Sequence, residues 1–229
     1  MSDAVPAWAY EKAEVLPHDP QLAGRALAER GRLARLLAPW LVDGVEHVGS
    51  TAVPGLAAKP VIDLMASVTD PDVVVVRAGE RLAADGWCYV PPELDRGGLW
   101  RRFFVKPDAS GQRRAAHLHV IRSGHPRWAE QIAFRDALRR DDRLARSYED
   151  LKRRLAVRHA GDREAYTDAK AEFVADALRR AGRAPADGLA TRELPVMTGS
   201  APRSAASLVT PGSVAGGWWL PAGGRGGAG

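Results

Sequence analysis

The run PVIDLMASV at residues 60–68 is almost entirely apolar and carries one charged side chain, Asp63. An apolar run of this length without polar alternation predicts a strand that is buried in the middle of a sheet. Shorter β-branched or aromatic runs predict further strands, and these lie at 45–48, 87–90, 101–106 and 115–122. The chain is therefore expected to build a sheet around residues 60–68.

Helical spacing of apolar residues separates and follows these strands. It predicts helices at 22–41, 72–84, 126–140, 142–158 and 162–180. Asp141 or Asp142 can cap the fourth of these helices, and Asp162 the fifth. Strands and helices alternate first and three helices follow as a block, so the sequence predicts an α/β (α+β) fold, with a mixed sheet, flanking helices and a C-terminal helical block.

The patterned part of the chain ends near residue 181, and we treat residues 1–181 as one domain. Residues 182–229 consist mainly of Gly, Ala, Pro and Ser, which cannot bury enough apolar surface to offset the entropy of ordering. We therefore expect a disordered tail. Its Trp218-Trp219-Leu220 segment is either a docking patch or part of an extension without function.

Composition narrows the location and the partners. A single cysteine, Cys88, excludes an intrachain disulfide and favours a reducing, cytoplasmic compartment. We find no signal peptide, and no run reaches the roughly 18 apolar residues of a membrane span, so no membrane partner is expected. The net charge of +5 includes no basic arm and no basic–aromatic groove, so nucleic acid is not an expected partner either.

The segment from Glu46 to Asp63 carries the strongest chemical signal. It predicts a strand, then a turn at Gly49-Ser50-Thr51, then the buried strand with its carboxylate. Backbone N–H groups and hydroxyls in such a turn can face an anion such as phosphate, and a carboxylate nearby can hold a divalent cation. The spacing does not match a P-loop or a dinucleotide-binding fingerprint.

His117 and His119 stand two residues apart on a predicted strand, so their rings share one face. With Asp63 they could form a two-histidine, one-carboxylate metal site for Mn, Fe or Zn, or they could be hydrogen-bonding or structural residues. Lys59 and Arg102 are candidates for neutralising phosphate charge, and the alternative for each is a solvated surface charge.

The segment HVGSTAVPGLAAKPVIDLMASV resembles the signature of the GrpB family, and matching motifs continue to about residue 181. The resemblance implies a nucleotidyltransferase-like fold, in which Gly49-Ser50 holds phosphate and Asp63 is the first acid of an Asp-x-Asp pair. Met65 stands where the second acid is expected. A thioether is a poor ligand for Mg²⁺, so standard two-metal transfer is in doubt.

Together these observations predict a protein that binds a nucleotide or another phosphorylated small molecule, with a divergent metal-dependent nucleotidyltransferase as the enzymatic version. Gly49, Ser50, Thr51, Lys59 and Arg102 would bind the phosphates. Asp63, His117 and His119 would hold a divalent metal (Mg or Mn, with Zn as an alternative), and Asp63 and His119 would be catalytic. The competing prediction is a non-catalytic accessory module with a protein partner, related to the domain fused to dephospho-CoA kinase.

Overall fold

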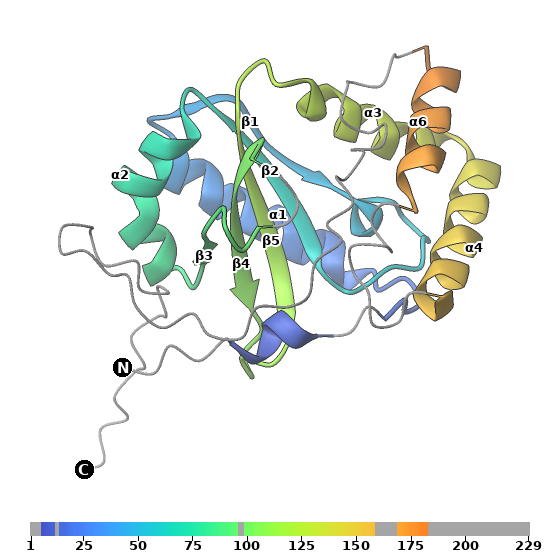
Figure 1. The fold of residues 1–229 in the computed structure, drawn as a ribbon, viewed down its shortest axis with the longest axis horizontal. Coiled ribbons are helices and arrows are strands. Elements are labelled where there is room, and N and C mark those ends of the chain that lie inside the picture. Colours follow the sequence, from blue (N-terminus) through green and yellow to red (C-terminus); the bar gives the residue numbers. More distant parts are fainter. Residues whose placement is uncertain (1–5, 12–13, 96–98, 159–168, 183–229) are drawn as a thin grey trace, which may run out of the picture.

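The computed structural model describes residues 6–11, 14–95, 99–158 and 169–182 (Figure 1). The tail predicted for 182–229 lies outside the described residues except for Gly182, and so does Asp162, the proposed cap. The described helices and strands confirm the mixed α/β architecture and its C-terminal helical block.

One five-stranded sheet forms the centre of the molecule, in the order β1-β2-β5-β4-β3. β2 and β5 are parallel, and the other neighbouring strands are antiparallel. The strands are β1 (Leu41–Val48), β2 (Ile62–Val68), β3 (Cys88–Val90), β4 (Arg101–Pro107) and β5 (Arg114–Arg122). The buried run predicted at 60–68 thus lies between two other strands, as its composition requires.

The helices are α1 (Gln21–Leu37), α2 (Pro71–Ala84), α3 (Pro126–Arg140), α4 (Asp142–Arg158) and α6 (Ala171–Arg180), with short 3-10 turns η1 (Ala7–Tyr10) and η2 (Ser50–Ala52). The prediction of a helix up to residue 41 was wrong at its end, because Leu41 already pairs with Val68 in the sheet. Asp141 accepts hydrogen bonds from two backbone N–H groups at the start of α4, so it provides the predicted cap.

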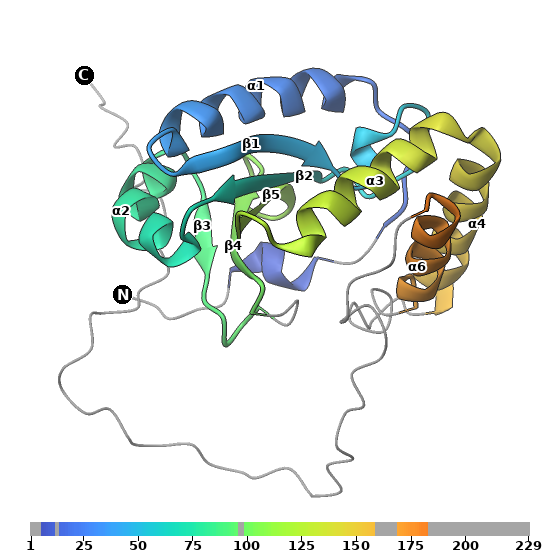
Figure 2. The ribbon, with the colours of Figure 1, turned by 90° about the horizontal axis from the view of Figure 1, so that it is seen from above.

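Different helices pack on the two faces of the sheet. α1 packs along one face and α3 along the other, as the view from above shows (Figure 2). The main core lies on the α1 and α2 side and includes Leu33, Leu64, Leu82 and Leu118, which are fully buried. This side of the sheet is closed by apolar packing, so any polar site on the sheet has to lie on the opposite face.

The C-terminal block packs against the connection between β1 and β2. Val53 and Leu56 of this connection form one apolar cluster with side chains of α3, α4 and α6, among them Phe134, Tyr148 and Leu178. The block therefore supports the Gly49-Ser50-Thr51 turn from one side. Among the residues that the structure describes, no helix combines the length and apolar character that crossing a lipid bilayer requires.

Candidate functional site

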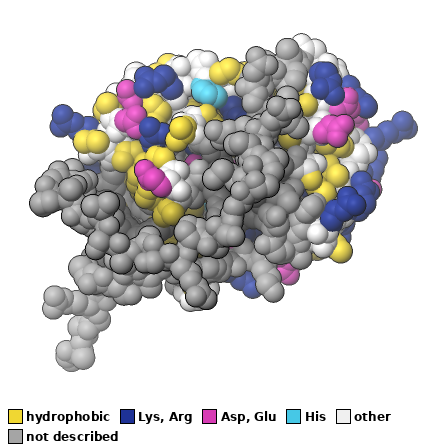
Figure 3. Space-filling model, in the orientation of Figure 1, with side chains coloured by type: hydrophobic (Ala, Val, Ile, Leu, Met, Phe, Trp, Pro, Cys, Tyr) yellow, Lys and Arg dark blue, Asp and Glu magenta, His cyan; other side chains and the backbone are white. Residues whose placement is uncertain are grey.

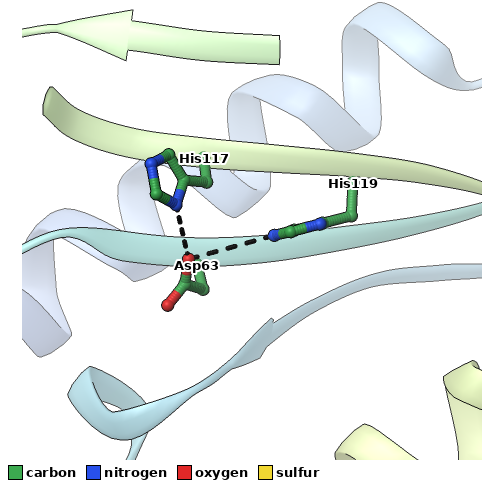
Figure 4. A group of neighbouring side chains, drawn as sticks. All are labelled: Asp63, His117 and His119. Carbon is green, nitrogen blue, oxygen red and sulfur yellow. Dashed lines mark hydrogen bonds and ion pairs between the residues drawn. The ribbon is translucent and has the colours of Figure 1, made fainter. Parts of the chain in front are cut away.

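Three polar side chains meet on the sheet face opposite α1 and α2. Asp63 of β2 is the direct register partner of His117 on β5, and His119 follows two residues later on the same face. Nδ1 of His117 lies 2.8 Å from Oδ1 of Asp63, and Nε2 of His119 lies 3.9 Å from the same oxygen (Figure 4). The side chain of Asp63 is 31% exposed, so the cluster is accessible to a ligand.

The protonation of this cluster follows from its contacts. Burial raises the pKa of Asp63, but hydrogen bonds and charge from His117 and His119 outweigh this effect and hold the pKa below its usual range. Burial lowers the pKa of His117, and burial together with Arg101 lowers the pKa of His119 to about 4. Burial thus shifts both histidines toward the neutral imidazole, while Asp63 is held as a carboxylate.

These three residues fit the requirements of a divalent metal ion in their spacing. One ligand atom from each of Asp63, His117 and His119 can be chosen so that all lie within 4.8 Å of one another. Ligand atoms that share a first-row metal sit about 2.0–2.2 Å from it, so they are roughly 3–4 Å apart. The distances of 2.8 Å and 3.9 Å to Oδ1 are close to this range.

Gly49 brings the turn after β1 directly against Asp63. Its φ of 71° belongs to the left-handed region, and a Cβ at this position would lie 2.5 Å from Oδ2 of Asp63. Both the backbone conformation and the close approach therefore require glycine. As a result, Ser50 and the backbone of η2 lie beside the carboxylate.

Two arginines of α3 bind this turn and the end of β1 that leads into it. Arg139 donates from Nε and Nη2 to the carbonyl of Ala52, at 2.9 and 2.7 Å. Arg135 donates to the carbonyl of His47 at 3.0 Å and forms an ion pair with Glu46. Sequence reasoning missed both residues, because their targets are backbone carbonyls about 90 positions away.

The two hydroxyls of the turn have different roles. Among the described residues, none forms a hydrogen bond with the Ser50 hydroxyl, which leaves it available to a ligand. Thr51 is 5% exposed, and its hydroxyl donates to the carbonyl of Val61 and contacts Nε2 of His47 at 3.0 Å. The expectation that the Thr51 hydroxyl binds phosphate is therefore corrected, because internal hydrogen bonds already use it.

The two predicted phosphate-neutralising residues are placed differently. Lys59 lies near enough to His117 to lower its pKa, but its ammonium forms an ion pair of 2.9 Å with Glu11. The expectation for Arg102 is corrected. Its register partner in the sheet is Val120, and its side chain forms an ion pair with Asp72 of α2, on the face away from the cluster. Adjacent strand residues point to opposite faces, so Arg101 occupies the site instead.

Arg101 contacts the cluster directly. Its Nη1 lies 2.5 Å from Nδ1 of His119, and its guanidinium also binds Asp95 through Nε and Nη2 at 2.9 and 2.7 Å. The sequence shows two adjacent arginines, and only the pairing of β4 with β5 decides which one faces the histidines.

The helical block adds a second cation. Lys170 lies directly before α6, and burial lowers its pKa to about 8, while the charge of Asp63 opposes this shift. Lys152 of α4 donates to the carbonyl of Ala57, and burial lowers its pKa to about 7. Lys170 thus stands within electrostatic reach of the cluster, whereas Lys152 holds the connection between the turn and β2.

Met65 stands where the resemblance to nucleotidyltransferases implies a second acid. It is 1% exposed and packs with Val48 and Ile121, so this part of the site face is apolar. The register partner of Met65 is His119. A histidine on the neighbouring strand therefore lies beside the position where an Asp-x-Asp pair would have its second carboxylate.

Several known proteins are similar to this chain. UPF0157 protein PA4798 of Pseudomonas aeruginosa is 40% identical over 176 residues, which cover 75% of this chain and 68% of that protein. UPF0157 protein YqkA of Bacillus subtilis is 31% identical over 172 residues, and here the match spans only 48% of the relative's length. A dephospho-CoA kinase of Mycobacterium leprae is 29% identical over 199 residues, which cover 75% of this chain and 47% of the kinase.

A solved structure and a family profile also match this chain. The crystal structure of conserved protein GrpB from Enterococcus faecalis matches with a TM-score of 0.59 and 28% identity, covering 74% of this chain and all of that one. The profile described as GrpB protein matches residues 12–180, which include every strand and helix of the sheet domain and the cluster around Asp63. The chain therefore belongs to the GrpB family.

Proposed function

We propose that this protein binds a phosphorylated small molecule, most simply a nucleotide, together with a divalent metal ion. One observation carries the proposal: the side chains of Asp63, His117 and His119 converge beside a turn whose glycine permits close approach of the backbone. An anion-binding turn next to a metal-binding set is the arrangement that phosphate ligands use.

The residues divide into two groups by their chemistry. Asp63, His117 and His119 would hold the metal, which supplies positive charge to phosphate oxygens when it is bound. Two nitrogen ligands and one oxygen ligand suit Mn or Zn better than Mg, which prefers oxygen alone. Ser50 and the backbone at Gly49 would contact the phosphate, with Arg101 and Lys170 as the nearby cations.

Nucleotidyl transfer remains the enzymatic version of this proposal, with Asp63 and His119 next to the reacting phosphate. The buried Met65 argues against the two-metal form of the reaction, because no second carboxylate stands on β2. The net charge of only +5 supports a small ligand over nucleic acid. On the face drawn in Figure 3, Asp and Glu side chains lie beside several of the visible Lys and Arg side chains.

Thermal unfolding of the full chain with a panel of ligands tests the proposal. The panel contains inorganic phosphate, nucleoside triphosphates and coenzyme A precursors, each with Mn²⁺, Zn²⁺ or Mg²⁺. A ligand at about 100 times its Kd stabilises by about 2.7 kcal/mol, which raises Tm by several degrees. We expect Asp63→Asn to abolish the shift and Asp72→Asn, an exposed carboxylate on α2, to keep it. No shift with any pair, or a shift that survives Asp63→Asn, would contradict the proposal.

The match to the Mycobacterium leprae dephospho-CoA kinase favours a second candidate, a non-catalytic accessory module. In that case the chain would bind a protein partner, and the kinase half of such an enzyme is the first to test. Size-exclusion chromatography of this chain with a separately produced dephospho-CoA kinase distinguishes the candidates. A stable complex with no bound metal after purification supports the accessory module, whereas bound metal without a complex supports the ligand-binding site.

A further inference from the structure

The two histidines of the cluster differ in what surrounds their second nitrogen. Nε2 of His117 is buried, and none of the described residues forms a hydrogen bond with it. Nδ1 of His119 lies 2.5 Å from Nη1 of Arg101. His117 therefore carries its proton on Nδ1, where it donates to Asp63, and no described partner of Nε2 opposes a transfer of the proton to that nitrogen. The proton of His119, by contrast, is subject to Arg101.

A guanidinium donates hydrogen bonds and cannot accept them, so Nδ1 of His119 must be the acceptor. The single proton of the neutral ring is then on Nε2, the nitrogen that faces Oδ1 of Asp63. A metal ion needs a lone pair on Nε2, and the proton would have to move to Nδ1, against the N–H groups of Arg101. Metal coordination by His119 and the contact between Arg101 and His119 therefore exclude each other.

Arg101 has several further partners in this position. Asp95, whose side chain is 6% exposed, binds two of its nitrogens, and the guanidinium stacks on the rings of Trp100 and Phe103, at 5.1 and 4.2 Å from the ring centres. Trp100 also stacks on His119, with ring planes 7° apart. The contact between Arg101 and His119 is thus one of several that order the Arg101 side chain.

We propose that Arg101 determines which ligand the cluster accepts. This proposal rests on the proposed metal site. While Arg101 donates to His119, the site presents N–H groups and a guanidinium, which suit an anion such as phosphate. When an anion draws Arg101 away, His119 can move its proton to Nδ1 and offer Nε2 to a divalent metal. Arg101 is thus a positioning residue, and phosphate and metal bind with positive coupling through it.

The tautomer of His119 is the first test, and it requires no metal. Nitrogen NMR of the full chain labelled at histidine, with the His119 signals identified through His119→Gln, reports which ring nitrogen carries the proton. We expect an unprotonated, hydrogen-bonded Nδ1 in the wild type and a changed signal in Arg101→Met. A protonated Nδ1 in the wild type would overturn the proposal, whatever the metal site does.

Metal affinity is the second test, measured by calorimetry with Mn²⁺ and Zn²⁺ in the absence of phosphate. We expect Arg101→Met to bind metal about tenfold more tightly than the wild type, a gain that a damaged site cannot produce. Lys59→Met is the control, because it removes a positive charge near His117 without touching His119. Equal gains in both variants would attribute the effect to charge alone and overturn the proposal. Equal affinity of wild type and Arg101→Met would overturn it too, and no binding by either would also remove the metal site.

Discussion

Asp63 and His117 are direct register partners on the parallel strands β2 and β5, and Oδ1 of the one lies 2.8 Å from Nδ1 of the other. Residues in register on neighbouring strands point to the same face, so the pairing of the two strands creates this contact without help from any loop. The cluster therefore stands on two adjacent inner strands of the sheet. Its variants can be interpreted through local chemistry as long as the sheet is intact.

Gly49→Ala should damage the site more than its backbone strain predicts. An alanine Cβ would lie 2.5 Å from Oδ2 of Asp63, in addition to the cost of about 1–2 kcal/mol for a left-handed backbone. Gly55→Ala is a matched control, since its φ of 76° is similar and no atom lies within 4 Å of the added Cβ. We expect both to lower Tm and only Gly49→Ala to abolish ligand binding. Equal binding by the two variants would separate Gly49 from the site.

Ser50→Ala should weaken phosphate binding with little effect on stability, whereas Thr51→Val should mainly lower stability. Ser50 has a free hydroxyl, so its removal is expected to change the free energy of unfolding by less than about 0.5 kcal/mol while weakening phosphate binding. Thr51 uses its buried hydroxyl for Val61 and His47, and its loss should cost about 1–3 kcal/mol. Urea denaturation and ligand titration measure the two quantities. A large stability loss in Ser50→Ala would show that its hydroxyl is structural.

Arg139→Met should loosen the turn. The carbonyl of Ala52 would lose both of its guanidinium donors, and an unsatisfied carbonyl costs about 1–3 kcal/mol. We expect a lower Tm and weaker ligand binding, because the turn presents Ser50 to the ligand. Arg140→Met is the control, since it removes the same charge from the next exposed position, and among the described residues Arg139 and not Arg140 donates to Ala52. Unchanged ligand affinity in Arg139→Met would mean that the turn holds its shape without α3.

Lys152 should give the protein a pH-dependent stability. Its pKa falls from about 10.5 in the unfolded chain to about 7 in the fold because of burial. Between these values the unfolded chain binds the extra proton, so the free energy of unfolding should rise with pH from 7 to 10.

Between pH 7 and 10 the rise from Lys152 is on the order of 3 kcal/mol. We expect urea denaturation at pH 7, 8.5 and 10 to show a smaller rise in Lys152→Met than in the wild type. The comparison is necessary because Lys170, with a pKa of about 8, contributes in the same direction in both proteins. Parallel curves for the two proteins would contradict the burial of a titrating Lys152.

Local patterns were sufficient to predict most of the fold. The apolar run at 60–68 and the spacing in α3 and α4 depend only on neighbours in the chain, and both were predicted within two residues of their bounds. The end of α1 was not, because Trp40 and Leu41 continue the helical pattern. Pairing of Leu41 with Val68 places Leu41 in the sheet, and the hydrogen bond from Thr69 to the carbonyl of Trp40 holds Trp40 in the turn just before it. Long-range hydrogen bonds decided this boundary.

Some residues of the candidate site were likewise predictable from the sequence, and others were not. The turn at Gly49-Ser50, the carboxylate of Asp63 and the two histidines are visible in the sequence, because their types and spacings already suggest phosphate and metal chemistry. The choice of Arg101 over Arg102 depends on strand register, and the internal use of Thr51 depends on how the turn packs against Val61. Lys170 comes near Asp63 only through the packing of the helical block, from more than 100 residues away in the chain. A shift of one residue in the register of β4 would exchange the two arginines. Only the tertiary structure decides which cation reaches His119, since it alone sets that register.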